Sequence, residues 1–455
     1  MSRTELNSRL PLAEPLARNR KKNKNLKKKT VNIVTLGCSK NIVDSEVLMR
    51  QLGNDYSISH NSNEDADIQI VNTCGFIGDA KEESIDTILQ LTDAKSKGLT
   101  SKVYVTGCLS QRYKDSLIKE IPDVDGFFGV NDLADILKTL DVDYKLDLVG
   151  ERNLTTPKHY AYLKISEGCD RNCSFCAIPL IRGKHISRPI GELVKETGFL
   201  ASRGVKEIML IAQDLTYYGL DIYKKRRIAE LINNLSKVDG IEWIRLHYAY
   251  PQGFPEDLID EIKNNPKVCN YLDIPLQHIN NRILKSMKRA HDKEATLKLI
   301  EDFRNALPDS SLRTTLIVGY PGETEGEFDE LYDFVAKQRF DRLGVFRYSA
   351  EEDTSAFLLE DDVEEQTKQD RADKLMMLQQ QISLEKNRTK EGTFLKVLFD
   401  RHENGFCIGR TEFDSPEVDN EVLVQDENHE IKIGEFYKVK ILKGDFFDLH
   451  GELVK

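Results

Sequence analysis

Six of the eight cysteines in this chain have spacings that suit metal coordination. Cys169, Cys173 and Cys176 form a C-x-x-x-C-x-x-C triplet in the segment SEGCDRNCSFCAIP. Structural zinc and iron–sulfur clusters normally take four ligands, so three thiolates leave one position open for a substrate or cosubstrate. A zinc knuckle completed by His185 or by another cysteine is the alternative reading of this triplet.

A second trio has no local motif. Cys38, Cys74 and Cys108 each follow a predicted parallel strand, in the segments VTLGC, IVNTC and YVTGC. Parallel strands of one sheet end at one edge, so these three thiols are expected to meet there and form a second three-thiolate site. Ordinary burial of free cysteines is the alternative. Cys269 and Cys407 lack such neighbours, and we expect them to pack in hydrophobic cores.

Short apolar runs that alternate with helical periodicity position both trios. Residues 30–150 are predicted to form a parallel α/β domain, with strands at 31–37, 67–73 and 102–107. Residues 151–390 contain six further βα units, which predict a partial (β/α)6 barrel with its chemistry at the carboxyl ends of the strands. Its strands are expected at residues 161–166, 207–213, 243–250, 271–277, 312–319 and 343–348. The polar stretch 151–160 is the expected linker, and residues 366–390 are expected to be helical.

The two ends of the chain differ from this pattern. Residues 391–455 contain five short strand candidates, which predict a small antiparallel barrel of the oligonucleotide-binding type. Residues 1–29 are predicted to be a disordered basic tail, because residues 18–29 hold eight Lys or Arg and almost no apolar side chain. The tail is either a solvated extension or an electrostatic contact for RNA.

The overall composition limits the class of protein. The net charge of −11 over 455 residues argues against a protein that wraps nucleic acid along its whole surface. The chain lacks an apolar signal core and any run of about eighteen apolar residues, which predicts a cytoplasmic protein with no membrane partner.

Several motifs together resemble those of the methylthiotransferases of the radical S-adenosylmethionine superfamily. They are GCSKNIVDSE, NTCGFI, TGC, GCDRNCSFCAIPLIRG, DIPLQH and TTLIVGYPGETE. The resemblance runs from about residue 31 to the end of the chain, where the last module looks like a TRAM domain. It implies two [4Fe-4S] clusters, one on each cysteine trio. It also implies that S-adenosylmethionine serves both as methyl donor, to a sulfur species on the cluster of Cys38, Cys74 and Cys108, and as source of a 5'-deoxyadenosyl radical.

The resemblance also points to residues around the cosubstrate. The IVGYPGE segment at a predicted strand end is implied to lie against S-adenosylmethionine, with Phe175 and Gln213 as further candidates. An ordinary βα turn is the alternative for this segment, and Asp214 and His278 are strand-end residues with no assigned role. The residues implied in the segment are Gly319, Pro321, Gly322 and Glu323.

Two branches of the family modify either tRNA adenosines or an aspartate of small-subunit ribosomal protein number twelve. Residues 390–455 hold nine Lys or Arg against fifteen Asp or Glu. This acidity favours the basic ribosomal protein as partner, although it could serve solubility alone. The ribosomal-protein branch usually has a proline at Ser39 but shares Lys40 and Asn41. An electron donor is a further expected partner, and the alternatives are a tRNA methylthiotransferase and a non-enzymatic iron–sulfur carrier or ribosome-assembly factor.

Overall fold

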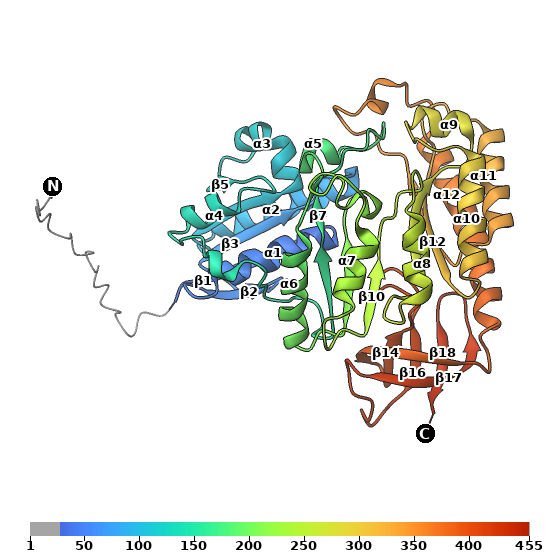
Figure 1. Ribbon diagram of the computed structural model, residues 1–455. Coiled ribbons are helices and arrows are strands. Elements are labelled where there is room, and N and C mark those ends of the chain that lie inside the picture. Colours follow the sequence, from blue (N-terminus) through green and yellow to red (C-terminus); the bar gives the residue numbers. More distant parts are fainter. Residues whose placement is uncertain (1–27, 455) are drawn as a thin grey trace, which may run out of the picture.

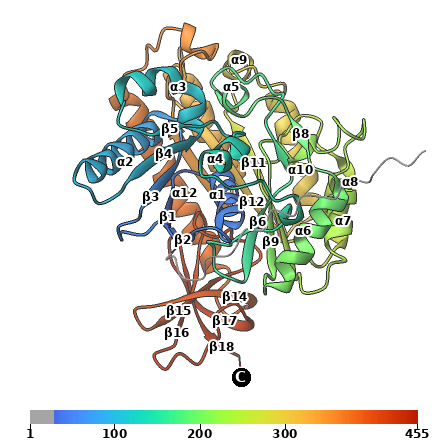
Figure 2. The same cartoon turned by 90° about the vertical axis from the view of Figure 1, so that its left-hand side faces the viewer.

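The computed structural model describes residues 28–454, which form three units (Figures 1 and 2). The first unit lies beside an open half-barrel, and a small closed barrel lies at one end of that half-barrel. The predicted basic tail lies outside the described residues, except for Lys28 and Lys29. Within residues 28–454, every helix is too short or too polar to cross a membrane.

The first unit is a five-stranded sheet in which every pair of neighbours is parallel, in the order β2-β1-β3-β4-β5. The three predicted strands are its centre, and two short strands that the sequence did not predict lie at its edges. The strands are β1 (Thr30–Thr35), β2 (Ser57–His60), β3 (Ile68–Thr73), β4 (Lys102–Gly107) and β5 (Gly126–Phe127). The helices are α1 (Ser39–Leu52), α2 (Gly78–Ser96), α3 (Cys108–Glu120) and α4 (Leu133–Thr139), followed by the 3-10 turn η1 (Leu146–Leu148).

The second unit contains the six predicted parallel strands. They form two three-stranded sheets, β6-β9-β10 and β11-β12-β13, joined by one bridge between Ile244 and Val268. The strands are β6 (Tyr160–Lys164), β9 (Glu207–Ile211), β10 (Trp243–Leu246), β11 (Tyr271–Gln277), β12 (Ser311–Val318) and β13 (Arg342–Arg347). The crossover helices are α6 (Ile190–Ser202), α7 (Ile228–Leu235), α8 (Glu256–Asn264), α10 (Lys293–Ala306) and α11 (Glu325–Gln338).

Shorter elements decorate the half-barrel. The hairpin β7–β8 and helix α5 lie in the segment after β6, and this segment carries the cysteine triplet. These elements are β7 (Ser166–Glu167), β8 (Ile186–Ser187), α5 (Ile178–Arg182), α9 (Asn281–Ser286), η2 (Leu215–Tyr217) and η3 (Ala356–Leu358).

Helix α12 (Glu365–Arg388) leads into the third unit, a closed barrel in the order β14-β15-β16-β18-β17. The sequence predicts only antiparallel neighbours, but β16 and β18 run parallel while the other four pairs are antiparallel. The strands are β14 (Phe394–Glu403), β15 (Phe406–Arg410), β16 (Val422–Gln425), β17 (Phe436–Gly444) and β18 (Leu449–Leu453).

The loop between β15 and β16 closes the amino-terminal end of the half-barrel. Arg342 at the start of β13 donates to Asp414, and Arg313 on β12 pairs with Asp419 at 3.3 Å. Both aspartates are about 1% exposed. Part of the acidity of the third unit is therefore neutralised inside the molecule, which weakens the argument that this acidity attracts a basic partner.

The first unit packs into the open half-barrel through α1. Val43 on α1 lies in one apolar cluster with Tyr160, Tyr162, Met209 and Ile211 on β6 and β9. The predicted linker is mostly irregular, as expected, but it is fixed in place by a buried arginine. Arg152 pairs at 2.9 Å both with Glu46 on α1 and with Glu196 on α6. Because breaking a buried ion pair is costly, this arginine holds the two units in one arrangement.

Candidate functional site

The trio of the first unit meets at one sheet edge. Cys38, Cys74 and Cys108 directly follow or soon follow β1, β3 and β4, which are adjacent and parallel. A Cβ atom placed on Gly37 would lie 2.9 Å from the Cys74 Sγ atom, and one placed on Gly75 would lie 2.7 Å from the Leu109 backbone nitrogen. The three cysteine-bearing segments are therefore in direct contact, as the strand-end argument predicts.

The environment of this trio suits a bound cation. Burial raises the pKa of the Cys108 thiol to about 12, and the thiols of Cys38 and Cys74 raise it further while Arg182 opposes the rise. Burial also raises the pKa of Cys74. Three thiolates in such a place repel one another unless a positive metal centre replaces their protons. The donor set of three soft sulfurs fits an iron–sulfur cluster with one open iron.

The second trio lies in the segment between the β7 and β8 strands, beyond the carboxyl end of β6. Burial raises the pKa of Cys169 to about 11 and that of Cys176 to about 12, and in both cases the neighbouring Cys173 thiol contributes to the rise. The backbone holds the loop, because the Cys169 nitrogen donates to Gly183 at 3.0 Å and the Cys176 nitrogen donates to Cys173 at 3.2 Å. This trio also has the donor set of a cluster with an open iron.

Two arginines that the sequence did not single out surround the second trio. Arg289 donates to the Cys173 Sγ atom at 3.4 Å, and the backbone nitrogen of Arg171 donates to the Cys169 Sγ atom at 3.4 Å. Their guanidinium groups lie 4.2 Å and 4.0 Å from the ring centre of Tyr250. These cations stabilise thiolates and any anionic group beside them.

Arg182 links the segment that carries the second trio to the first trio. It ends α5, six residues after Cys176, yet its guanidinium lies 3.7 Å from the Cys108 Sγ atom of the other unit. The same group donates to Asn41 at 2.7 Å, and it is 1% exposed. Cys108 also shares an apolar cluster with Ala177, the residue after Cys176. The two sites therefore face each other across the interface of the first and second units.

Lys40 lies at the same interface. Its side chain is buried, and its ammonium lies 3.8 Å from the ring centre of Tyr248, which follows β10 in the half-barrel. With residues 28–454 it forms neither an ion pair nor a hydrogen bond. Burial lowers the pKa of this ammonium, and Cys38, Glu167 and Asp273 raise it without forming an ion pair with it. The position therefore favours a further anionic ligand that could pair with Lys40.

The predicted cosubstrate loop after β12 is built around Glu323. The Glu323 carboxylate is fully buried, accepts a hydrogen bond from the Gly319 nitrogen, lies 3.1 Å from His278 and pairs with Arg371 at 3.1 Å. The structure thus brings together Glu323 and His278, which the sequence placed at separate strand ends. A Cβ atom on Gly319 would lie 2.2 Å from Lys368 on α12, so the packing of that helix alone requires glycine there.

The remaining predicted residues lie at the same end of the half-barrel. Phe175 packs beside Tyr320 and Met287, in the loop of the second trio. Gln213 follows β9, is half-buried and forms no hydrogen bond with residues 28–454. Asp214 instead fixes the local turn and pairs with Arg171 at 2.9 Å. Pro321 is buried and Gly322 donates its N–H to Asp362 at 2.6 Å.

Known protein families match each of the three units. The chain matches the family described as the radical SAM superfamily over residues 163–335, the uncharacterized protein family UPF0004 over residues 30–129 and the TRAM domain over residues 392–454. The radical S-adenosylmethionine methyltransferase TsrM from Kitasatospora setae, a structure with a bound [4Fe-4S] cluster, aligns with a TM-score of 0.52 at 13% identity. That alignment covers 90% of this chain and 84% of the other and shows a shared fold.

Curated relatives are much closer in sequence. The ribosomal protein uS12 methylthiotransferase RimO of Flavobacterium johnsoniae is 57% identical over 94% of this chain and 99% of its own length. The protein of the same name from Phocaeicola vulgatus is 54% identical over 94% of this chain and 100% of its own length. The two facing cysteine trios and these full-length matches lead to one conclusion: the chain belongs to the uS12 methylthiotransferase family of radical S-adenosylmethionine enzymes, which use a [4Fe-4S] cluster and S-adenosylmethionine.

Proposed function

We propose that this enzyme adds a methylthio group to the β-carbon of an aspartate in ribosomal protein uS12 and uses two [4Fe-4S] clusters. The observation that carries the proposal is the pair of three-thiol sites at one interface, where Arg182 and Ala177 from the segment of the second trio contact Cys108 of the first. Cys38, Cys74 and Cys108 would hold one cluster, and the triplet of the half-barrel would hold the other.

When bound, the clusters would supply a sulfur acceptor for methylation at the first trio and, at the second, the electron that cleaves S-adenosylmethionine to a 5'-deoxyadenosyl radical. The chain itself contributes positioning. Arg289 and Arg171 hold the thiolates of the second trio and present positive charge beside it, where the cosubstrate carboxylate would bind. Arg152 and Arg182 fix the two units, so the sulfur site and the radical site stay at a constant separation.

Lys40 favours an aspartate substrate over an adenosine. A carboxylate on the modified residue itself could pair with this ammonium next to the reacting carbon, whereas an adenosine could offer only its phosphate, since its base carries no negative charge. The acid group would be held while hydrogen is removed from the adjacent carbon. Beside Lys40, the family resemblance supports the ribosomal protein as the target. The basic tail as a contact for ribosomal RNA and a separate electron donor remain part of the proposal.

The test is mass spectrometry of uS12 and of bulk tRNA after anaerobic reaction with the reconstituted enzyme. We expect a mass increase of one methylthio group on a uS12 aspartate and unchanged tRNA. Methylthioadenosine in tRNA with unmodified uS12 would refute the proposed substrate.

A variant tests the role of Lys40. Lys40→Met removes the charged hydrogen bond that Lys40 would form with the substrate aspartate, worth about 1.5–3 kcal/mol, so kcat/KM for uS12 should fall by about 10-fold to 150-fold. The 5'-deoxyadenosine released without uS12 should be unchanged. Equal loss of this release would show that Lys40 supports a cluster and does not bind the substrate.

A further inference from the structure

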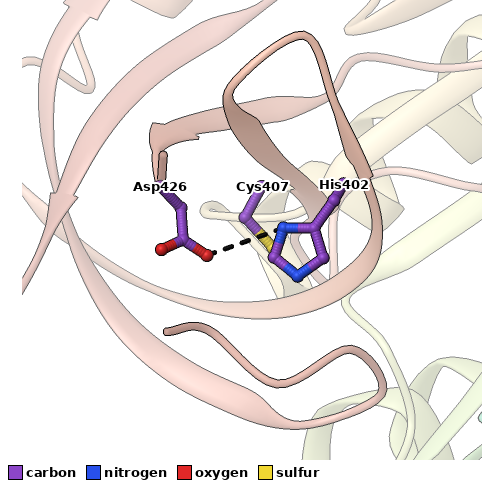
Figure 3. Close-up of side chains that lie close together, drawn as sticks. All are labelled: His402, Cys407 and Asp426. Atoms are coloured by element: carbon purple, nitrogen blue, oxygen red, sulfur yellow. Dashed lines mark ion pairs between the residues drawn. The ribbon is translucent and has the colours of Figure 1, made fainter. Parts of the chain in front are cut away.

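One end of the closed barrel contains three potential metal ligands far from both cysteine trios in the sequence. His402 on β14 and Cys407 on β15 lie directly opposite each other in the antiparallel pair. Asp426 directly follows β16 (Figure 3). One nitrogen, one sulfur and one oxygen of these side chains all lie within 4.8 Å of one another.

The Nε2 atom of His402 has a hydrogen-bond partner, but its Nδ1 atom has none. Its Nε2 atom lies 3.1 Å from the Ile431 carbonyl oxygen, which can only accept, so Nε2 carries the proton of the bond. The Nδ1 atom is buried, has no hydrogen-bond partner and points at an Asp426 oxygen 3.6 Å away (Figure 3). That distance is too long for a hydrogen bond. The contact is an ion pair if the ring carries a second proton, and otherwise the Nδ1 lone pair faces the carboxylate with nothing between them.

The Asp426 carboxylate is held in this orientation by the backbone. One oxygen accepts from the Glu430 nitrogen at 2.8 Å, and the oxygen that faces His402 accepts from the Ile431 nitrogen at 3.0 Å. Metal-binding histidines and carboxylates usually have their other atoms fixed in this way. The Cys407 side chain is fully buried within the barrel core, 6% of the Asp426 side chain is exposed, and the more accessible His402 faces solvent on one side.

We propose that His402, Cys407 and Asp426 bind one zinc ion that closes this end of the barrel. Sulfur, imidazole nitrogen and carboxylate oxygen are all zinc ligands, and a bound ion would fill the gap between Nδ1 and the carboxylate. Binding replaces the thiol proton of Cys407, which passes to solvent, and changes no oxidation state. The fourth ligand is water or the exposed His429, whose ring centre lies 4.3 Å from that of His402.

The site is distinct from the two trios, so the test must read zinc separately from iron. The anaerobically reconstituted full-length enzyme is equilibrated with zinc chloride, desalted, and analysed for both metals and by X-ray absorption at the zinc edge. We expect one zinc per chain, with one sulfur neighbour at about 2.3 Å and nitrogen or oxygen neighbours at about 2.0–2.2 Å.

Variants assign the site. Cys407→Ser and His402→Gln should each lower zinc by at least tenfold with unchanged iron, while Cys269→Ser, the matched change at another buried lone cysteine, should keep both metals. Because His402 is partly exposed, His402→Gln remains informative if Cys407→Ser fails to fold. Wild-type enzyme without zinc, zinc retained by His402→Gln, or three sulfur neighbours around zinc would each overturn the proposal.

Discussion

Replacement of Arg182 by methionine should lower the reduction potential of the proposed cluster on Cys38, Cys74 and Cys108, although it removes none of these three cysteine ligands. The guanidinium lies 3.7 Å from the Cys108 Sγ atom and is 1% exposed, so solvent screens it poorly. A hydrogen bond from a charged donor is worth about 1.5–3 kcal/mol. For a one-electron couple this free energy corresponds to about 60–130 mV, since about 1.4 kcal/mol, or 59 mV, is a tenfold change.

The sign follows from charge. Reduction would add an electron to the proposed cluster on Cys108, and a nearby cation would stabilise the reduced form, so Arg182→Met should lower the reduction potential. Asp44 and Glu167, which lie at 3.2 Å and 2.8 Å from Arg182, offset part of its charge. We therefore expect a shift near the lower limit, about 60 mV.

The assay is a redox titration followed by electron paramagnetic resonance. The second trio is replaced by alanines in every sample, so that only the first cluster contributes. Arg152→Met is the matched control, because Arg152 is equally buried and bridges the same two units without contacting a cysteine. A potential unchanged within about 20 mV in Arg182→Met, or an equal shift in the control, would refute the reasoning.

Two further predictions concern the packing of the Cys74 segment against α3 and the Arg282–Glu327 pair at the start of α11. Gly75→Ala should displace the Cys74 segment from α3, with an overpacking cost of about 1–3 kcal/mol and loss of iron from the first site, because its Cβ atom would lie 2.7 Å from the Leu109 nitrogen. Gly78→Ala, whose nearest atom is 3.9 Å away, should keep its iron, and the same loss there would contradict the clash. The Arg282 hydrogen bond lowers the pKa of Glu327 to about 2, below its ordinary value of 4.5. This stabilises α11 above pH 4.5 and is lost as the pH falls towards 2. The protection of the α11 amides, measured relative to their intrinsic exchange rates, should therefore fall more with acid in the wild type than in Glu327→Gln, and an equal fall in both proteins would count against the pair.

The sequence was sufficient to predict the elements that carry the cysteines. Strands β1, β3 and β4 are short apolar runs, and a shared strand-end position is enough to place Cys38, Cys74 and Cys108 at one edge of a parallel sheet. The barrel strands were predicted for the same reason. The short edge strands β2 and β5 were missed, because four and two residues give almost no periodic signal.

Residues that act between units could not be predicted. Arg182 follows the cysteine triplet in sequence, but its contact with Cys108 depends on how two separate sheets face each other. Arg152 appeared to belong to a polar linker, yet it is buried between two glutamates from different units. Asp414 is a further example. The sequence counts it among the acidic residues that could attract a partner, but in the fold it is buried and paired with Arg342 of the half-barrel.

The chain is proposed to hold two separate clusters, each on three cysteines. The most direct measurement is the iron and sulfide content after anaerobic reconstitution of three proteins: the wild type and two variants that each replace one whole trio with alanines. We expect about eight iron atoms per chain in the wild type and about four in each variant. About four in the wild type, or no loss of iron in either variant, would contradict the account.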